Sequence, residues 1–223
     1  MIFFYADDFG YNSSIDNEII RLYKMGKIKS FSILSDYLLL ASKNSINFVK
    51  NKKATIHINL IEGKKYDILI IFVIKLFLGL VDLKAIKKDI QRQIDILKKF
   101  EIKIIQLNSH QHIHALYPIS KIFISLAKKN KIPKIRSYQN LKAQTLRGKL
   151  CIILLKMTSY LSSIRYASKF SLPETWRFKS NNQYYMSWED KGFSMNKVED
   201  KKTDIIIHPG SEFDKNSNFV KYL

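Results

Sequence analysis

The sequence predicts an α/β fold with parallel strands in one domain. Short apolar runs of the kind that form buried strands alternate with amphipathic helical segments of ten or more residues. Strands that are separated by helices pair in parallel through crossover connections. The 223 residues, 46% of them apolar, can build one core, since α/β barrels of about 200–250 residues fold as single domains. We therefore expect one domain over residues 1–223.

The first half of the chain opens with two predicted strands around a helix. Residues 2–5 and 31–34 are apolar runs, and Ile15, Ile19 and Leu22 recur between them at helical spacing. A third predicted strand covers residues 55–60.

The most hydrophobic stretch of the chain is residues 68–81. Lys75 interrupts it, and it is shorter than the roughly 20 apolar residues that a spanning helix needs. We expect a helix that is buried or lies in an interface.

The second half continues the alternation. A predicted helix over residues 84–100 has Ile86, Ile90, Ile94 and Leu97 at helical spacing and leads to a strand at 103–107. The later predicted elements are a helix near 119–126, a strand at 132–136, a longer helix near 146–161 and a last strand at 204–207. Residues 171–202 are polar, rich in aromatic residues and irregular, and no repeat or low-complexity linker is present.

All five histidines fall inside three short motifs, and a fourth motif contributes paired carboxylates. The motifs are Ala6-Asp7-Asp8-Phe9-Gly10, His57-Ile58-Asn59-Leu60, Ser109-His110-Gln111-His112-Ile113-His114 and His208-Pro209-Gly210. Each lies within or just after a predicted strand, and the carboxyl ends of parallel strands meet at one face of the fold. Histidine and carboxylate are the groups that a divalent metal and a general acid/base pair require. The sequence thus predicts a site at that face.

The paired carboxylates also have simpler interpretations. An Asp before a helix commonly caps it, which would give Asp7 and Asp8 a structural role without metal binding or catalysis. Asp8-Phe9-Gly10 matches the metal-binding tripeptide of protein kinases, but no glycine-rich loop or His-Arg-Asp loop accompanies it. Adjacent carboxylates that differ in role are better explained if one binds a metal and the other takes a proton.

The histidines are likewise ambiguous one by one. His57 alone would more often be a core histidine. In an extended segment His110, His112 and His114 would face one side, like a three-histidine metal site. Pro118 and the helix beyond predict that the strand ends within this cluster, which leaves open whether all three reach one ion. His208-Pro209-Gly210 has strong turn chemistry, yet a histidine at a strand end is placed to exchange protons.

The charge pattern favours a solvated basic surface. The formal net charge is +19, but lysines are spread from Lys24 to Lys221 without a compact run of alternating basic and aromatic residues. A specific nucleic-acid partner is therefore not expected, while general attraction to anionic glycans, lipid headgroups or nucleic acid stays open. A lone cysteine, Cys151, gives no disulfide framework, and no secretory signal is readable. A cytoplasmic location fits, including the inner face of the membrane.

In this order and with these gaps, the four motifs resemble the YdjC-like carbohydrate deacetylases, the family that includes chitooligosaccharide deacetylase. The resemblance spans residues 1 to about 214. It implies a single distorted (β/α) barrel related to that of the NodB-type polysaccharide deacetylases. The implied reaction is hydrolysis of an acetyl group from an N-acetylated amino sugar or oligosaccharide, free or carried on a glycan or lipid.

Carried over by motif position, the resemblance assigns roles to the site residues. Asp8, His57 and His110 become ligands of one divalent metal, with Mg²⁺ usually assigned and Zn²⁺ chemically compatible. Asp7 becomes the general base, and His208 becomes the general acid or a group that stabilises charge near the leaving amine. His112 and His114 would line the site. Sugar contacts, with core packing or a place in a surface loop as the alternatives, are expected from Arg136, Trp176, Tyr184, Tyr185 and Trp188.

The chain departs from the family pattern at two points. Asn108 stands where the family usually has Asp before the histidine cluster, so a carboxylate that orients a ligand histidine is missing. Relatives commonly continue beyond His-Pro-Gly into an arginine-bearing helix, so we expect a chain shortened at its C-terminus. Reduced activity or another substrate would follow.

Two other functions stay open, a metal phosphoesterase and a non-catalytic relative that binds carbohydrate or nucleic acid. The expected partner is an N-acetylated sugar. Peripheral contact with a membrane or an anionic glycan, and a homodimer, are compatible with the sequence.

Overall fold

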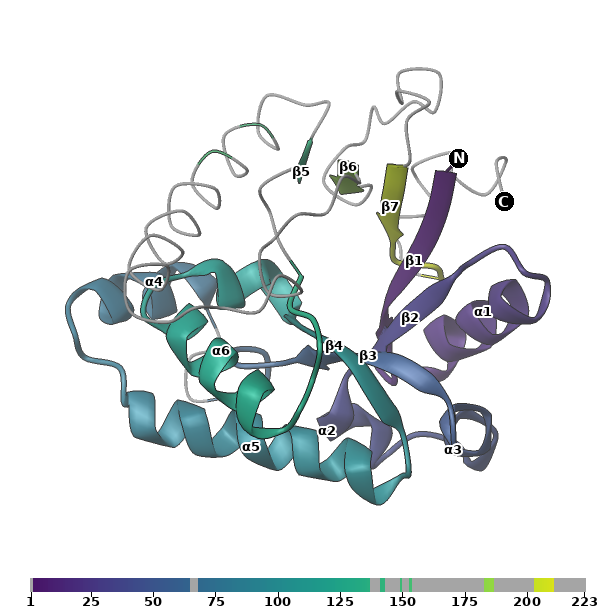
Figure 1. Cartoon of the computed structure of the whole chain (residues 1–223), viewed down its shortest axis with the longest axis horizontal. Coiled ribbons are helices and arrows are strands. Elements are labelled where there is room, and N and C mark those ends of the chain that lie inside the picture. Colours follow the sequence, from purple (N-terminus) through teal and green to yellow (C-terminus); the bar gives the residue numbers. More distant parts are fainter. Residues whose placement is uncertain are drawn as a thin grey trace.

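The structure, a computed structural model, describes residues 2–64, 68–136, 141–142, 149, 153, 183–186 and 203–210. Its strands form one seven-stranded sheet in the order β4-β3-β2-β1-β7-β6-β5, and every pairing in it is parallel (Figure 1). The prediction of a parallel α/β fold is therefore confirmed. Most of the predicted helix near 146–161 and of the segment 171–202 lies outside the described residues, as do Trp176 and Trp188.

The elements follow the predicted alternation. The strands are β1 (Ile2–Phe9), β2 (Ser30–Ile33), β3 (Lys53–Ile58), β4 (Lys103–Ser109), β5 (Leu141–Lys142), β6 (Gln183–Met186) and β7 (Thr203–Ile207). The helices are α1 (Ser13–Lys24), α2 (Ser35–Leu38), α3 (Lys43–Val49), α4 (Leu69–Phe77), α5 (Leu83–Lys99), α6 (Ile119–Lys129) and the 3₁₀-helix η1 (His110–Ala115). The strand predicted at 132–136 is a single parallel bridge from Ile135 to Leu107 of β4. Tyr184 and Tyr185 lie in β6.

The sheet is compatible with the predicted (β/α) barrel. Ile135 pairs with β4 at one end of the sheet, and Leu141, six residues later, pairs with β6 at the other end. Six extended residues span at most about 20 Å, so the two ends approach each other. Among the described strands, no hydrogen-bonded pairing joins β4 to β5.

Helix packing places the strand ends at one edge. The residues at helical spacing in α5, namely Ile86, Ile90, Ile94 and Leu97, are all buried, as the sequence predicts. The predicted helix residues of α1, including Ile19 and Leu22, also join the core. Because each of these helices returns the chain to the start of the next strand, the carboxyl ends of β1, β3, β4 and β7 share one edge (Figure 1).

Helix α4 occupies the hydrophobic stretch. Phe72 and Leu76 pack into the core, whereas most of its other apolar side chains are exposed. In the part of the chain that the structure describes, no helix has the length and apolarity to cross a membrane.

Candidate metal centre and acid/base site

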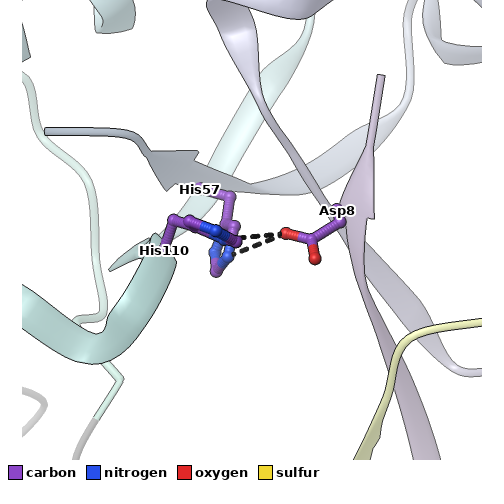
Figure 2. A group of neighbouring side chains, drawn as sticks. All are labelled: Asp8, His57 and His110. Carbon is purple, nitrogen blue, oxygen red and sulfur yellow. Dashed lines mark hydrogen bonds and ion pairs between the residues drawn. The ribbon is translucent and has the colours of Figure 1, made fainter. Parts of the chain in front are cut away.

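The three residues that the resemblance assigns to a metal lie together at the carboxyl edge of the sheet. The Asp8 Oδ1 atom is 3.2 Å from Nε2 of His57 and 3.2 Å from Nδ1 of His110 (Figure 2). One potential ligand atom from each residue lies within 4.8 Å of the others. Asp8 lies near the end of β1, His57 lies in β3 and His110 follows β4, so three strands build a cluster of one carboxylate and two imidazoles.

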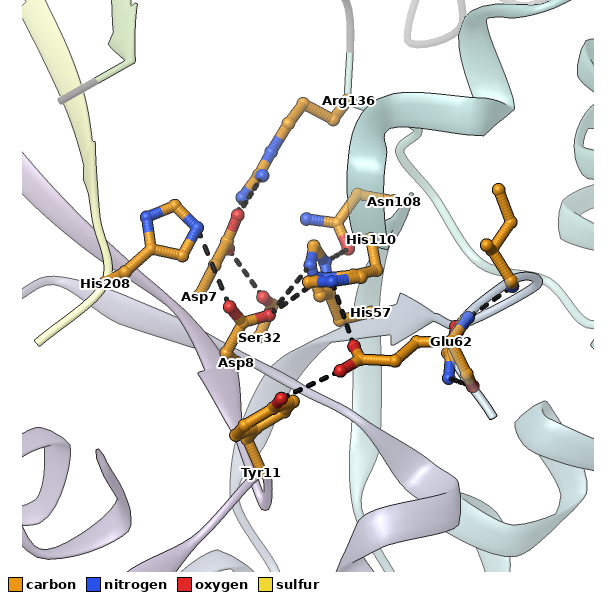
Figure 3. A network of polar contacts seen from close by, with 12 residues as sticks. Asp7, Asp8, Tyr11, Ser32, His57, Glu62, Asn108, His110, Arg136 and His208 are labelled. Carbon is orange, nitrogen blue, oxygen red and sulfur yellow. Dashed lines mark hydrogen bonds and ion pairs between the residues drawn. The ribbon is translucent and has the colours of Figure 1, made fainter. Parts of the chain in front are cut away.

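A bulge in β1 turns both carboxylates toward this cluster. Adjacent residues in a regular strand point to opposite faces of the sheet. The pairing of β1 with β2 shifts register between Ala6 and Phe9, and Asp8 has a left-handed φ of 68°. Gly10 follows with a φ of 100°, where an added Cβ would lie 3.1 Å from the Leu34 carbonyl oxygen. The irregular strand end thus brings Asp7 and Asp8 into one polar network (Figure 3).

Asp7 is buried in a tight pair with Arg136. Two guanidinium nitrogens donate to its carboxylate at 2.5 and 2.9 Å, and the Ser32 hydroxyl donates at 2.5 Å. Burial acts to raise the pKa of Asp7, but the Arg136 charge and those of nearby histidines hold it well below its usual range. Asp7 is therefore ionised at neutral pH. Arg136, predicted to contact substrate, lies against Asp7, and a direct sugar contact stays a prediction.

Asp8 and His110 form a second charged pair. Burial would raise the pKa of Asp8, yet hydrogen bonds from His110 and His57 lower it well below the usual value. Burial would lower the pKa of His110, but the Asp8 and Glu62 carboxylates raise it to about 10. Opposite charges therefore face each other where the ligand atoms meet.

Glu62 is a site residue that the sequence reasoning missed. Its Oε2 atom lies 3.3 Å from Nε2 of His110, and Tyr11 donates its hydroxyl to Oε1 at 2.7 Å. That hydrogen bond is the main reason that the pKa of Tyr11 rises to about 12. Glu62 thus contacts the ring nitrogen of His110 that faces away from Asp8.

Asn59 holds the loop that presents Glu62. Its side-chain oxygen accepts from the backbone N–H groups of Ile61 and Glu62, and its amide donates to the Glu62 carbonyl at 2.7 Å. Gln93 of α5 fixes Asn59 through both backbone groups. The sequence signal was present, since Glu62 is the first carboxylate after His57, but nothing in the spacing shows which histidine it reaches.

Asn108 lies between His57 and Arg136. Its amide is 2.7 Å from Nδ1 of His57. With the nitrogen on that side, the amide also donates to the Ile56 carbonyl at 2.7 Å, and its oxygen accepts from Arg136 at 2.8 and 2.9 Å. Asn108 therefore supplies hydrogen bonds to His57 and Arg136 but no charge, whereas Asp7 supplies a negative charge to Arg136.

The histidine cluster does not act as one three-histidine ligand set. Strand β4 ends at Ser109, and Gln111 and His112 have left-handed φ angles of 53° and 59° within η1. The prediction that the strand ends at this motif is confirmed.

His112 and His114 are buried, and neither belongs to the group of three residues whose potential ligand atoms meet. His114 contacts the Ser109 hydroxyl at 2.7 Å and the Arg136 carbonyl at 3.2 Å. Burial, with Arg136 nearby, lowers the pKa of His112 to about 3 and that of His114 well below the usual value. Both rings are neutral, and their contact with substrate stays a prediction.

His208 approaches Asp8 from β7, on the side opposite His57 and His110 (Figure 3). Its Nε2 atom is 3.8 Å from Oδ2 of Asp8. Gly210 has a φ of 78° and packs so closely on α1 that an added Cβ would lie 3.1 Å from the Ser14 carbonyl oxygen. This close packing fixes the turn that positions His208.

Comparisons with known proteins identify the family of the chain and a similar fold. A model of the YdjC-like protein family matches residues 1–221. The fold is similar to that of a protein from Enterococcus faecalis V583, provisionally described as a cellobiose-phosphate cleavage protein, with a TM-score of 0.56 and 16% identity over 96% of this chain and 84% of that chain. No curated protein matches the chain. Because the family match covers nearly every residue and all four motifs, the chain belongs to the YdjC-like protein family.

Proposed function

We propose that the protein is a metal-dependent hydrolase that removes the acetyl group of an N-acetylated amino sugar or oligosaccharide. The observation that carries the proposal is the pairing of the Asp8, His57 and His110 cluster with a second, separately held carboxylate, Asp7. Membership of the YdjC-like family supports a carbohydrate substrate. Two carboxylates in different surroundings suit two different tasks.

The cluster fits one divalent ion. Three protein ligands with the remaining positions open are typical of catalytic zinc sites. Imidazole suits Zn²⁺ and similar transition metals, whereas Mg²⁺ prefers oxygen ligands. The two histidines therefore favour Zn²⁺ on chemical grounds, against the Mg²⁺ that the resemblance implies, and a test needs both ions.

The residues around the cluster supply the proton transfers. When bound, the ion would polarise the acetyl carbonyl and lower the pKa of a water molecule. Asp7, held ionised by Arg136, accepts the proton of the attacking water. Because Arg136 also makes Asp7 a weak base, this transfer requires a water that is itself acidified. His208, across Asp8 from the histidine ligands, donates a proton to the departing amine.

Acetate release tests the proposal directly. The protein is assayed with N-acetylated mono- and oligosaccharides and with a phosphate ester, each with Zn²⁺ or Mg²⁺. We expect metal-dependent acetate release and no phosphate release. Phosphate release would favour a phosphoesterase. Sugar binding without either product, with the metal bound, would indicate a non-catalytic relative.

Glu62→Gln is expected to weaken metal binding. The change removes the negative charge beside His110 that fixes its ring, and loss of such an outer partner typically costs about 10–100-fold in metal affinity. Calorimetric titration with Zn²⁺ measures the effect. The control is Glu18→Gln, which removes a surface carboxylate paired with Arg21 on α1. Equal affinities for wild type and Glu62→Gln would show that Glu62 has no positioning role.

A further inference from the structure

An exposed apolar surface covers α4 and the turn after it. Its members are Ile68, Leu69, Ile70, Ile71, Ile74, Phe77, Leu78 and Leu80, each between 38% and 70% exposed. We call them the α4 surface. Phe72 and Leu76 anchor the helix in the core, and Lys75 is its only charged residue. A surface helix normally turns polar residues outward, so a contiguous apolar surface of this kind marks an interaction site.

The α4 surface lies at the same edge of the sheet as the candidate metal centre. Helix α4 belongs to the connection that leaves the carboxyl end of β3, just after His57, and it follows Glu62 in that connection. Helix α5 then carries the chain back to the opposite end of the sheet, where Lys103 starts β4 (Figure 1). The connection that contains α4 therefore begins at the edge of the sheet that holds the candidate metal centre.

Charge indicates what covers the α4 surface. Exposed Lys84, Lys87 and Lys88 follow it in the first turns of α5, and the whole chain has a formal net charge of +19. Two copies of so basic a protein repel each other, whereas an anionic bilayer attracts it. A nine-residue helix is too short to span a bilayer, but it can lie in the plane of the headgroups with apolar side chains inserted.

We propose that the α4 surface docks into the interface of an anionic bilayer, and that the acetylated sugar is carried on a lipid in that bilayer. Ile70 and Phe77 would enter the boundary between headgroups and acyl chains, while the lysines of α5 contact lipid phosphates. A site at the same edge then faces the headgroup layer, where the sugar of a glycolipid is displayed. The substrate part rests on the proposed deacetylase function; the docking part does not.

Vesicle flotation tests the docking. The full chain is mixed with phosphatidylcholine vesicles that contain or lack phosphatidylglycerol. We expect binding to the anionic vesicles that weakens with added salt. The double change Ile70→Gln and Phe77→Gln should lower the partition coefficient at least about tenfold, since two large apolar side chains are then no longer buried in the bilayer.

Matched variants keep the test specific. Ile70 and Phe77 are 64% and 70% exposed, so their replacement should leave the thermal unfolding temperature unchanged. The control is Met25→Gln, which changes an apolar residue 54% exposed at the end of α1 and should bind vesicles like wild type. Absence of wild-type binding, or equal binding by the α4 variant, would overturn the docking. A dimer that the α4 variant dissociates, without vesicle binding, would assign the surface to a second copy.

Acetate release separates the two parts of the proposal. On soluble N-acetylglucosamine, the α4 variant should release acetate at the wild-type rate. On a vesicle-embedded lipid that bears the same sugar, its rate should fall at least about tenfold, because its partition coefficient falls by that factor. Vesicle binding without acetate from either substrate would leave docking intact and contradict the deacetylase. Acetate release from both substrates at equal rates in wild type and variant would contradict the lipid-linked substrate.

Discussion

Asp7→Asn should abolish activity and also destabilise the protein. Loss of a general base typically lowers the rate about 100- to 10,000-fold. The same change takes the Asp7 carboxylate away from the buried Arg136 guanidinium, and Asn108, which also contacts the guanidinium, is neutral. Breaking a buried ion pair on one side costs about 3–5 kcal/mol. The measurements are acetate release at a temperature where the variant is folded, and urea unfolding.

A second variant separates the two effects. Most of the cost of a one-sided change comes from the buried charge that is left uncompensated, and replacing both partners by uncharged groups of similar volume removes that charge. Asp7→Asn combined with Arg136→Gln should therefore unfold at a urea concentration close to that of wild type, yet remain inactive. Recovery of activity in the double variant would show that Asp7 serves Arg136 and not the reaction.

Stability should fall in acid because of the same pair. The folded-state pKa of Asp7 is depressed below the ordinary 3.8, so its stabilising contribution is complete above that value and is lost as the pH falls toward the folded pKa. Wild type should therefore lose the stability that this pair contributes as the pH falls below about 4. The double variant at residues 7 and 136 should lose less over the same range, as measured by urea unfolding at stepwise lower pH.

Asp8→Asn should abolish metal binding while keeping the strand end in place. The Asp8 carboxylate is the point at which His57, His110 and His208 meet, and an amide is a poor ligand beside two imidazoles. Asparagine tolerates the left-handed backbone that residue 8 adopts, unlike most residues. We therefore expect no measurable Zn²⁺ binding by calorimetry and no acetate release, with the circular dichroism spectrum unchanged.

His57→Ala provides the parallel case on a regular strand. His57 lies in β3 with an ordinary backbone, so its loss removes a ligand without a backbone effect. Zn²⁺ affinity close to that of wild type in both variants would contradict the metal centre.

The sequence predicts well which strands contribute to this site, for a physical reason. Apolar runs define buried strands, and parallel strands separated by helices must end at one edge, so Asp8, His57 and His110 were expected together. The pairing of Asp7 with Arg136 was not predictable, because it joins β1 to a segment beside β4 that is 129 residues later. Glu62 was missed for a similar reason, since its direction depends on how Asn59 folds the loop.

The backbone geometry of the histidine motif was harder to predict than the position of the site. Periodicity placed three histidines of the Ser109–His114 motif on one side, but two consecutive left-handed residues turn the chain within η1. Left-handed backbone angles cannot be predicted from the spacing of apolar residues. Here they occur at Gln and His, and not at Gly, which would have indicated them. Only the later helix and Pro118 indicated that the strand must stop.

At residue 8 the requirements of folding and those of chemistry diverge. A left-handed torsion is one that glycine adopts freely and that costs an ordinary residue about 1–3 kcal/mol, yet the position holds an ionised, nearly buried carboxylate. A sequence selected for stability alone would place glycine there and lose the cluster. The backbone angle of residue 8 is thus a point at which stability is given up for activity, and engineering for heat resistance should leave that residue untouched.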